Sequence, residues 1–503
     1  MPPGADARTS RPGPGLLLSA ALVALTALSL AEPNAAQPDL GPRALLPDAL
    51  VPWAPSAPVV AGVMWAGYGI GAVGLAWAWH RQRGIVIPAW LPWGLALVAL
   101  LGVPIGSADH VHYAAYGQIA LEGGNPWAES PIAWQGGTDP VTSRVEAPWT
   151  ETPSVYGPFI TLVQLAVAAL GADDIRAVVW WWQVVIVGSW LLVRHALITI
   201  LPAQQNRVDL VWTVNPLVWS IAVLGAHVDT VATALVIAAV LVLGARVGWG
   251  RVAASGALVA AAGSTKFTYA VAGLAIAWVY GVRGVPPSSR LRVLVSLAVG
   301  FLAAAVPLHL WSNGHAYDQL ARTRQSVSLA TPWRLVLEAL RPALGSGTTR
   351  TLILGGAAIM AVVLLAAYLR LTRPLPTVDR SPDLRITTLW LIGGLTFAYA
   401  AAAPYSLPWY DLLIWGTMPA VSGAIALWLN GIRLLVLACA YVPGRVSGLT
   451  PRVEEVTLGF RRGVAPWLEL ALWVAWIGAA WSRWGRLRSD EPVATERPPS
   501  LRP

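Results

Sequence analysis

One polar stretch, "SADHVHYAAYGQIALEGGNPW" (107–127), directly follows an apolar run over residues 91–105. Asp109 is expected to cap a helix that spans residues 110–121. The residues that would share one face of this helix are Asp109, His112, Tyr113 and Tyr116. A carboxylate flanked by imidazole and phenol groups is suited to removing a proton from a hydroxyl group. A carboxylate that only caps the helix would be a weaker base, and both roles stay open.

Further polar residues stand at the ends of other apolar runs. His227 and Asp229 in "GAHVD" are two positions apart, so they do not share a helix face. Asp229 is expected to cap a helix beginning at Thr230, with His227 in the preceding turn. Lys266, the only lysine of the sequence, either neutralises a phosphate or extends its amine to the membrane interface.

Two other segments hold weaker candidates for binding. Arg322 and Arg324 belong to the polar loop 311–325 and are either ordinary loop arginines or phosphate contacts. Trp409 and Tyr410, in "PYSLPWYD", either belong to the interfacial aromatic belt or stack on a sugar. No metal site is predicted, because His110 and His112 alternate and no partner motif accompanies them.

The elements that position these residues are predicted to be membrane-spanning helices. The 503 residues are 56% hydrophobic and only 12% charged, where soluble domains carry about 25% charged residues. Apolar runs of about 17–25 residues recur along the chain, which predicts an all-α polytopic membrane protein with about 12–14 transmembrane helices. The runs cover residues 15–31, 59–80, 88–105, 177–200, 208–225, 229–245, 251–265, 267–282, 291–311, 351–372, 386–403 and 410–429, with 434–443 and 465–482 as two further candidates.

The net charge of +9 is almost entirely arginine, and it is not interleaved with aromatic residues as nucleic-acid binding would require. Arginine clusters favour the cytoplasmic face. This rule holds along the chain if residues 157–171 form a surface helix and do not cross the membrane. Residues 106–176 then form a large external loop with interfacial helices, and residues 312–350 form a second one. The single transmembrane domain spans 1–488 and precedes a disordered cytoplasmic tail, 489–503. Two points stay open: the topology after residue 430, and whether residues 1–31 are a retained helix or a cleaved signal.

The ordered motifs resemble a known family. "DHVHYAAYGQIALEGGNPW", "TPSVYGPF", "NPLVWSIAVLGAHVDTV", "STKFTYAV" and "LPWYD" are similar to the actinobacterial GT-C glycosyltransferases. The nearest resemblance is to the polyprenol-phosphate-mannose-dependent α-(1→6)-mannosyltransferases of lipomannan and lipoarabinomannan assembly. The family's Asn-Pro-aromatic pattern falls on Asn125. The sequence departs from the family at Val228, where asparagine is more frequent, and at His110, where a hydrophobic residue is more frequent.

This resemblance implies a GT-C fold in the cell membrane with an external active site and no cofactor. By the same likeness, Asp109 is the general base of an inverting transfer of a sugar, with mannose as the expected sugar, from a polyprenyl-phosphate donor to a glycolipid or glycan acceptor. Cations for the donor phosphate would be drawn from Lys266, His315, Arg322 and Arg324. Three alternatives remain: a flippase or transporter for lipid-linked sugars, a polyprenyl-phosphate arabinosyltransferase of the same fold, and a scaffold in an envelope-assembly complex.

Overall fold

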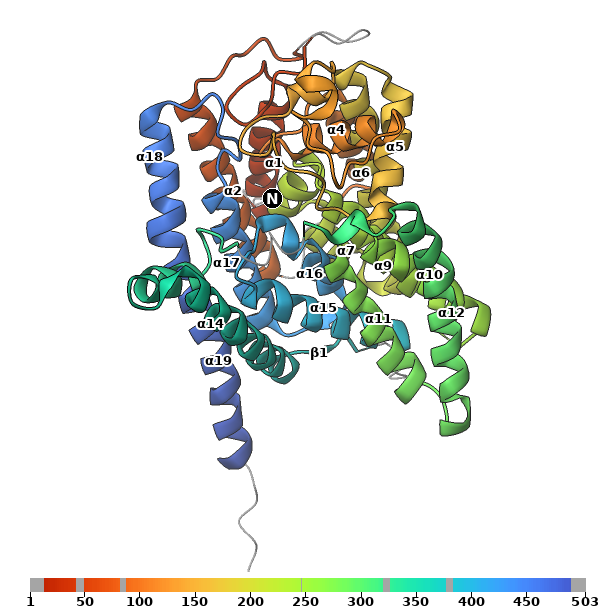
Figure 1. Ribbon diagram of the computed structural model, residues 1–503. Coiled ribbons are helices and arrows are strands. Elements are labelled where there is room, and N and C mark those ends of the chain that lie inside the picture. Colours follow the sequence, from red (N-terminus) through yellow and green to blue (C-terminus); the bar gives the residue numbers. More distant parts are fainter. Residues whose placement is uncertain are drawn as a thin grey trace, which may run out of the picture.

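The computed structural model describes residues 13–41, 49–81, 87–245, 247–319, 326–376 and 383–489. Figure 1 shows an almost entirely helical molecule, which confirms the predicted all-α class. Its α-helices are α1 (Pro14–Leu30), α2 (Ala57–Arg81), α3 (Leu91–Leu101), α4 (Asp109–Leu121), α5 (Pro158–Gly171), α6 (Ile175–Ile200), α7 (Gln205–Val208), α8 (Pro216–Val218), α9 (Val228–Leu243), α10 (Trp249–Gly263), α11 (Val271–Ile276), α12 (Pro287–Trp311), α14 (Trp333–Leu371), α15 (Leu384–Ala402), α16 (Leu412–Thr417), α17 (Ala424–Ala440), α18 (Pro451–Gly459) and α19 (Ala465–Ser489).

Short 3₁₀ and π segments complete several of these helices. They are η1 (Trp134–Gly137), η2 (Thr142–Arg144), η3 (Pro202–Gln204), η4 (Asp209–Thr213), η5 (Trp219–Leu224), η6 (Phe267–Ala270), η7 (Ala277–Arg283), η8 (His315–Tyr317), η9 (Pro408–Asp411), η10 (Met418–Ala420) and η11 (Phe460–Val464). The strands β1 (Arg373–Pro374) and β2 (Val421–Ser422) pair antiparallel in a two-stranded sheet.

Within the described residues, six helices are long and apolar enough to cross a membrane, or seven if the bent pair Pro202–Thr213 and Pro216–Leu224 is one span. Shorter apolar helices, among them α1, α9 and α17, accompany them. Three predicted boundaries are wrong. The run 410–429 is divided by β2, and 434–443 is mostly the second half of α17. The predicted loop 312–350 is already helical from Trp333. The predicted tail lies outside the described residues beyond Ser489.

One face of the bundle, here called the loop face, gathers the segments that surround Asp109 (Figure 1, upper end). The Gly106 N–H donates to the Ala36 carbonyl, and the Ile105 N–H donates to the carbonyl of Leu224. The Arg445 guanidinium pairs with Glu146. This contact places the segment after α17 on the loop face, which the sequence left open. Arg445 also donates to the carbonyls of the 31–41 loop, so it ties three distant loops together.

The opposite face, here called the arginine face, holds several paired arginines. Arg194 forms a two-pronged pair with Asp209, with distances of 2.6 and 3.0 Å. The Arg207 Nε donates to the Pro419 carbonyl beside β2, and Arg385 pairs with Asp383 at the start of α15. The β1–β2 sheet lies on this face as well, because Leu375 donates its N–H to Ala420. The two faces are therefore chemically distinct.

Helix α5 returns to the loop face and does not cross to the arginine face. At its start, the Gly157 N–H donates to the Thr265 carbonyl beside Lys266. After its end, the Asp173 carboxylate accepts from Gln118 of α4. The close packing of α4 on α5 depends on Gly117, because a Cβ there would lie 2.3 Å from the Gln164 carbonyl oxygen. Both ends of α5 therefore contact residues of the loop face, whereas its place at the membrane surface stays a prediction.

A proline breaks the span that delivers His227 to the loop face. Asn215 caps α8, since its side chain accepts from the Leu217 N–H, and Pro216 occupies the first turn. The two halves of the span are bent by 49° at this point. The segment then continues through η5 to Gly225, so the following turn presents His227 toward α4.

Candidate functional site

Asp109 is the first residue of α4, but it does not cap the helix as predicted. The Ser107 hydroxyl accepts the Asp109 N–H at 2.8 Å, and no side chain caps α4 from its N-cap position, Ala108. The carboxylate turns instead to neighbouring side chains. Its Oδ2 lies 3.3 Å from His227 Nδ1 and 3.4 Å from the Tyr113 hydroxyl. The Asp109 side chain is 20% exposed, so it remains reachable from outside the protein.

His227 is held against Asp109 by an aromatic stack. Its ring lies nearly parallel to Trp409, with 3.8 Å between ring centroids and 16° between planes. The ring is buried, and the adjoining pocket includes Tyr68, Ser220 and Tyr441 among its lining residues. Asp109, Tyr113, His227 and Trp409 are called the base cluster below. Three segments far apart in the sequence therefore lie together around one carboxylate, with Trp409 packed behind His227.

A second group, the ion-pair cluster, comprises Asp229, Lys266, Tyr269 and Tyr410. The Asp229 Oδ1 accepts from Lys266 Nζ at 2.9 Å and from the Tyr269 hydroxyl at 3.0 Å. The Lys266 ammonium also lies 3.5 Å from the centroid of the Tyr410 ring, a cation–π contact. Asp229 does not cap a helix starting at Thr230 as predicted, because α9 begins at Val228 and His227 is its N-cap residue.

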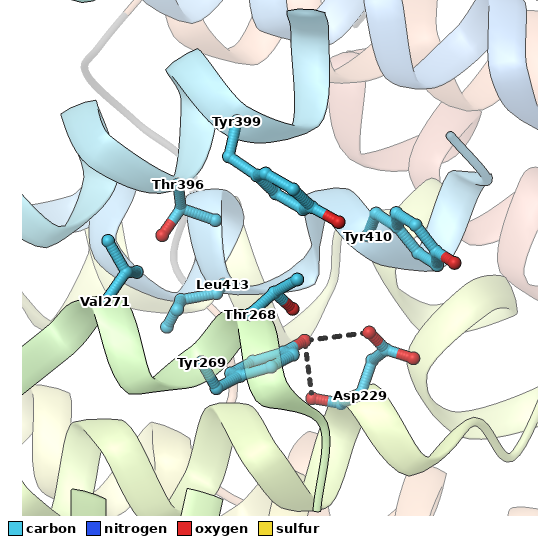
Figure 2. Close-up of a pocket in the computed structure, with 8 residues that line it drawn as sticks. All are labelled: Asp229, Thr268, Tyr269, Val271, Thr396, Tyr399, Tyr410 and Leu413. Carbon is cyan, nitrogen blue, oxygen red and sulfur yellow. Dashed lines mark hydrogen bonds between the residues drawn. The ribbon is translucent and has the colours of Figure 1, made fainter. Parts of the chain in front are cut away.

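A pocket opens beside the ion-pair cluster. Figure 2 shows Tyr399 and Tyr410 on one side of it, with Tyr269 and Asp229 on the other. Asp229 is fully buried, yet its second oxygen, Oδ2, has no hydrogen-bond partner among the described residues. The Thr396 hydroxyl of α15 is likewise buried without a partner there. The complete lining is Asp229, Thr268, Tyr269, Val271, Thr396, Tyr399, Tyr410 and Leu413.

Three predicted residues of α4 and its turn have other contacts. The Tyr116 hydroxyl donates to the Thr152 carbonyl of the loop, at 2.9 Å. His112 is buried beside Tyr116, with 6.5 Å between ring centroids. The Asn125 side chain accepts the Trp127 N–H, so this amide closes its own turn. Of the four residues predicted to share a face, Tyr113 is the one that contacts Asp109.

The predicted cation candidates divide into three cases. Lys266 is paired with Asp229. His315 is exposed and pairs with Asp318, at 2.7 Å, within the loop after α12. Arg322 and Arg324 lie outside the described residues. Of the two described candidates, Lys266 is the one that belongs to the candidate site.

Several residues of the site were missed by sequence reasoning. Tyr156, within the quoted "TPSVYGPF", packs edge-on against Tyr113 with 5.3 Å between ring centroids. Arg433 is buried in α17, where its guanidinium contacts Asp411, 3.1 Å away, and Glu469, 2.5 Å away. The available signals were an isolated charge directly before the apolar run 434–443, another within 465–482 and a third within 410–429, because ionisable residues in a membrane usually pair with one another.

Arg433 braces the turn that carries Trp409 and Tyr410. Besides its two acidic partners, it donates to the Ser406 hydroxyl at 2.9 Å and to the Ala400 carbonyl at 3.0 Å. Ser406 precedes the two aromatic residues and Asp411 follows them, so the guanidinium contacts the turn at both ends. The two clusters therefore depend on contacts made from the C-terminal helices.

The environment of Asp109 keeps its carboxylate ionised. Burial acts to raise the pKa of Asp109, but the hydrogen bond and charge of His227, aided by His112 and His110, hold it below its ordinary value of 3.8. Burial raises the pKa of Tyr113 well above its ordinary value, so this phenol remains a donor to Asp109. Burial also lowers the pKa of His110 to about 3, which leaves that ring neutral. At neutral pH the cluster thus presents an unprotonated carboxylate beside a phenol donor.

Comparison with known proteins agrees with the resemblance. The chain is 24% identical over 415 residues to alpha-(1->6)-mannopyranosyltransferase B of Corynebacterium glutamicum, which covers 75% of this chain and 65% of that protein. It is 29% identical over 142 residues to a probable alpha-(1->6)-mannopyranosyltransferase of Mycolicibacterium smegmatis, covering 28% of this chain and 25% of that protein. The chain thus matches less than two thirds of the length of either relative. No solved structure matches it.

A family model described as "Alpha-(1->6)-mannopyranosyltransferase, N-terminal domain" matches residues 15–282, more than half of the chain. The matched region holds Asp109, His227, Asp229 and Lys266, whereas Trp409 and Tyr410 lie beyond it. The chain therefore belongs to the alpha-(1->6)-mannopyranosyltransferase family.

Proposed function

We propose that the protein is a membrane mannosyltransferase that uses Asp109 as its general base. The observation that carries this proposal is the state of the Asp109 carboxylate. It is ionised and reachable, its partners are a phenol and an imidazole, and it stands on the loop face beside the pocket that His227 lines. A base must reach the proton that it removes. The Asp109 carboxylate meets that need, because it is partly exposed and does not cap a helix. Family membership supports mannose as the sugar.

The donor in this proposal is a polyprenyl-phosphate mannose. A hydroxyl of the glycan or glycolipid acceptor gives its proton to Asp109, and its oxygen forms a bond to the anomeric carbon. The bond from that carbon to the phosphate oxygen breaks on the opposite side, and its electron pair leaves with the polyprenyl phosphate. Configuration is inverted, and Asp109 later returns its proton to water. The lipid chain suits a protein whose helices are apolar on their outer faces.

The proposed site faces away from the cytoplasm. The support is the distribution of arginines: Arg194, Arg207 and Arg385 lie on the arginine face, and the positive-inside rule assigns such a face to the cytoplasm. The loop face then meets the cell exterior, where the acceptor glycans of a cell envelope are found. Arg176, Arg445 and Arg461 are exceptions in position, and Glu146 balances the charge of Arg445.

Purified protein with a panel of polyprenyl-phosphate sugars tests the proposal. Release of polyprenyl phosphate and a new α-(1→6)-linked product are expected with the mannose donor and not with the arabinose donor. Release with arabinose alone would make the protein an arabinosyltransferase. Movement of intact donor across a vesicle bilayer without release would identify a flippase. Either result would overturn the proposed function.

A further inference from the structure

We infer that the pocket beside Asp229 is the subsite for the donor's sugar ring, and that the Asp229 Oδ2 accepts a hydrogen bond from one of its hydroxyls. This inference rests on the proposed function and deepens it. The first support is the unmet need of the oxygen itself. A buried carboxylate oxygen without a donor is costly, whereas a hydrogen bond to it removes that cost.

The pocket lining favours a neutral, hydroxyl-rich ligand over an anion. Asp229 and Lys266 cancel each other's charge, and the Lys266 ammonium is directed at Oδ1. An approaching phosphate oxygen would meet the Oδ2 acceptor without a proton between them, which is repulsive. A sugar hydroxyl instead donates to Oδ2, while the buried Thr396 hydroxyl offers both a donor and an acceptor. Carbohydrate and pocket are thus complementary in hydrogen bonding.

The walls of the pocket supply the apolar surface that a sugar ring also requires. Figure 2 shows the rings of Tyr399 and Tyr410 on the side facing Asp229 and Tyr269. The free space is narrow, and Tyr399 is 41% exposed, so a ring enters by displacing this side chain at the outer wall. The Asp229 carboxylate is expected to keep its position during such a displacement, because Lys266 and Tyr269 both donate to it.

The position of the pocket directs the sugar toward the proposed base. Asp229 is two residues from His227, and Tyr410 adjoins Trp409, whose ring stacks on His227. A ring bound at Asp229 therefore lies next to the base cluster. The phosphate is left to the remaining donors of Lys266, since an ammonium has three N–H groups and Asp229 accepts one of them.

The test separates recognition of the sugar from recognition of the phosphate. Binding of short-chain polyprenyl-phosphate mannose and of polyprenyl phosphate is measured in detergent micelles. In Asp229→Asn, the amide oxygen is expected to keep Lys266 and Tyr269 as donors, which turns the NH₂ toward the ligand. That group cannot accept a hydrogen bond. We expect a loss of about 10- to 100-fold in affinity for the mannosylated lipid and no loss of affinity for polyprenyl phosphate, because Lys266 keeps its charge and no longer faces a carboxylate.

A milder pair of variants guards against misfolding. Thr396→Val removes the pocket hydroxyl. Thr388→Val is its control on the same helix, because the Thr388 hydroxyl donates to the Leu384 carbonyl and does not line the pocket. Only the former should weaken binding of the mannosylated lipid. Equal affinity of wild type, Asp229→Asn and Thr396→Val for this lipid would overturn the inference and leave the proposed function intact. A wild-type protein that binds neither lipid would instead overturn the proposed function.

Discussion

The contact between His227 and Asp109 makes a specific prediction about pH dependence. His227→Leu removes the imidazole whose Nδ1 lies 3.3 Å from the Asp109 carboxylate. Because the hydrogen bond and charge of His227 are what hold the pKa of Asp109 down against burial, their loss raises that pKa. The base is active when ionised, so the acid limb of the rate profile moves to higher pH.

The size of this shift follows from the geometry. A hydrogen bond to a charged group contributes about 1.5–3 kcal/mol. At about 1.36 kcal/mol for each pKa unit, the pKa of Asp109 rises by about 1 to 2 units. Wild-type kcat/KM should therefore stay level with falling pH through the ordinary carboxyl pKa of 3.8, whereas the variant should lose activity above that pH. His227→Gln keeps a donor near Asp109 and should recover part of the shift.

The assay is kcat/KM for mannosyl transfer from polyprenyl-phosphate mannose, measured between pH 3.5 and 8 in a buffer of constant ionic strength. The lower end of this pH range includes the ordinary carboxyl pKa. His315→Leu is the matched control, because it also removes an imidazole that pairs with an acid on a loop, but with Asp318. Its profile should match that of wild type. An unshifted acid limb in His227→Leu, or an equal shift in the control, would refute the assigned contact.

Two further predictions concern stability. Arg433→Met leaves Asp411 and Glu469 buried without a counter-charge, which should lower the free energy of unfolding by about 3–5 kcal/mol in denaturant titration. Adding Asp411→Asn and Glu469→Gln should restore most of the lost stability. An undiminished loss in the triple variant would contradict the charge argument. Gly117→Ala forces a Cβ to 2.3 Å from a carbonyl oxygen of α5 and should cost about 1–3 kcal/mol. Gly188→Ala, in open space on α6, should cost nothing, and equal effects of the two would refute the close packing of α4 on α5.

Much of the grouping of the candidate residues was predictable from charge and hydropathy. The arginine pattern placed Asp109, the 225–229 turn, Lys266 and the 404–411 turn on one face, and the structure brings residues of all four into two adjoining clusters. Such a prediction works because apolar runs define the crossings and each crossing changes the face. It required only that α5 not be counted as a crossing.

Individual side-chain partners were less accessible to sequence reasoning. Asp109 and Asp229 both precede predicted helices, which favours capping. In the structure, the Ser107 hydroxyl accepts the N–H of Asp109 at the start of α4, and Asp229 accepts a hydrogen bond from Lys266, 37 residues away. Local pattern cannot weigh a cap against a partner brought in by tertiary packing. The contacts of Arg433 with the 406–411 turn were missed for the same reason, because the partners of Arg433 come from separate elements.

The central claim is that Asp109 accepts the proton of the attacking hydroxyl, and a single-turnover comparison of Asp109→Asn with wild type tests it most directly. The change preserves shape and removes the base, so we expect transfer from bound polyprenyl-phosphate mannose to slow by about 10² to 10⁴-fold. Affinity for the donor should stay within about 2-fold, because the assigned sugar contact is with Asp229. Asp209→Asn, on the arginine face, controls for loss of a buried acid. Transfer by Asp109→Asn at the wild-type rate would contradict the account.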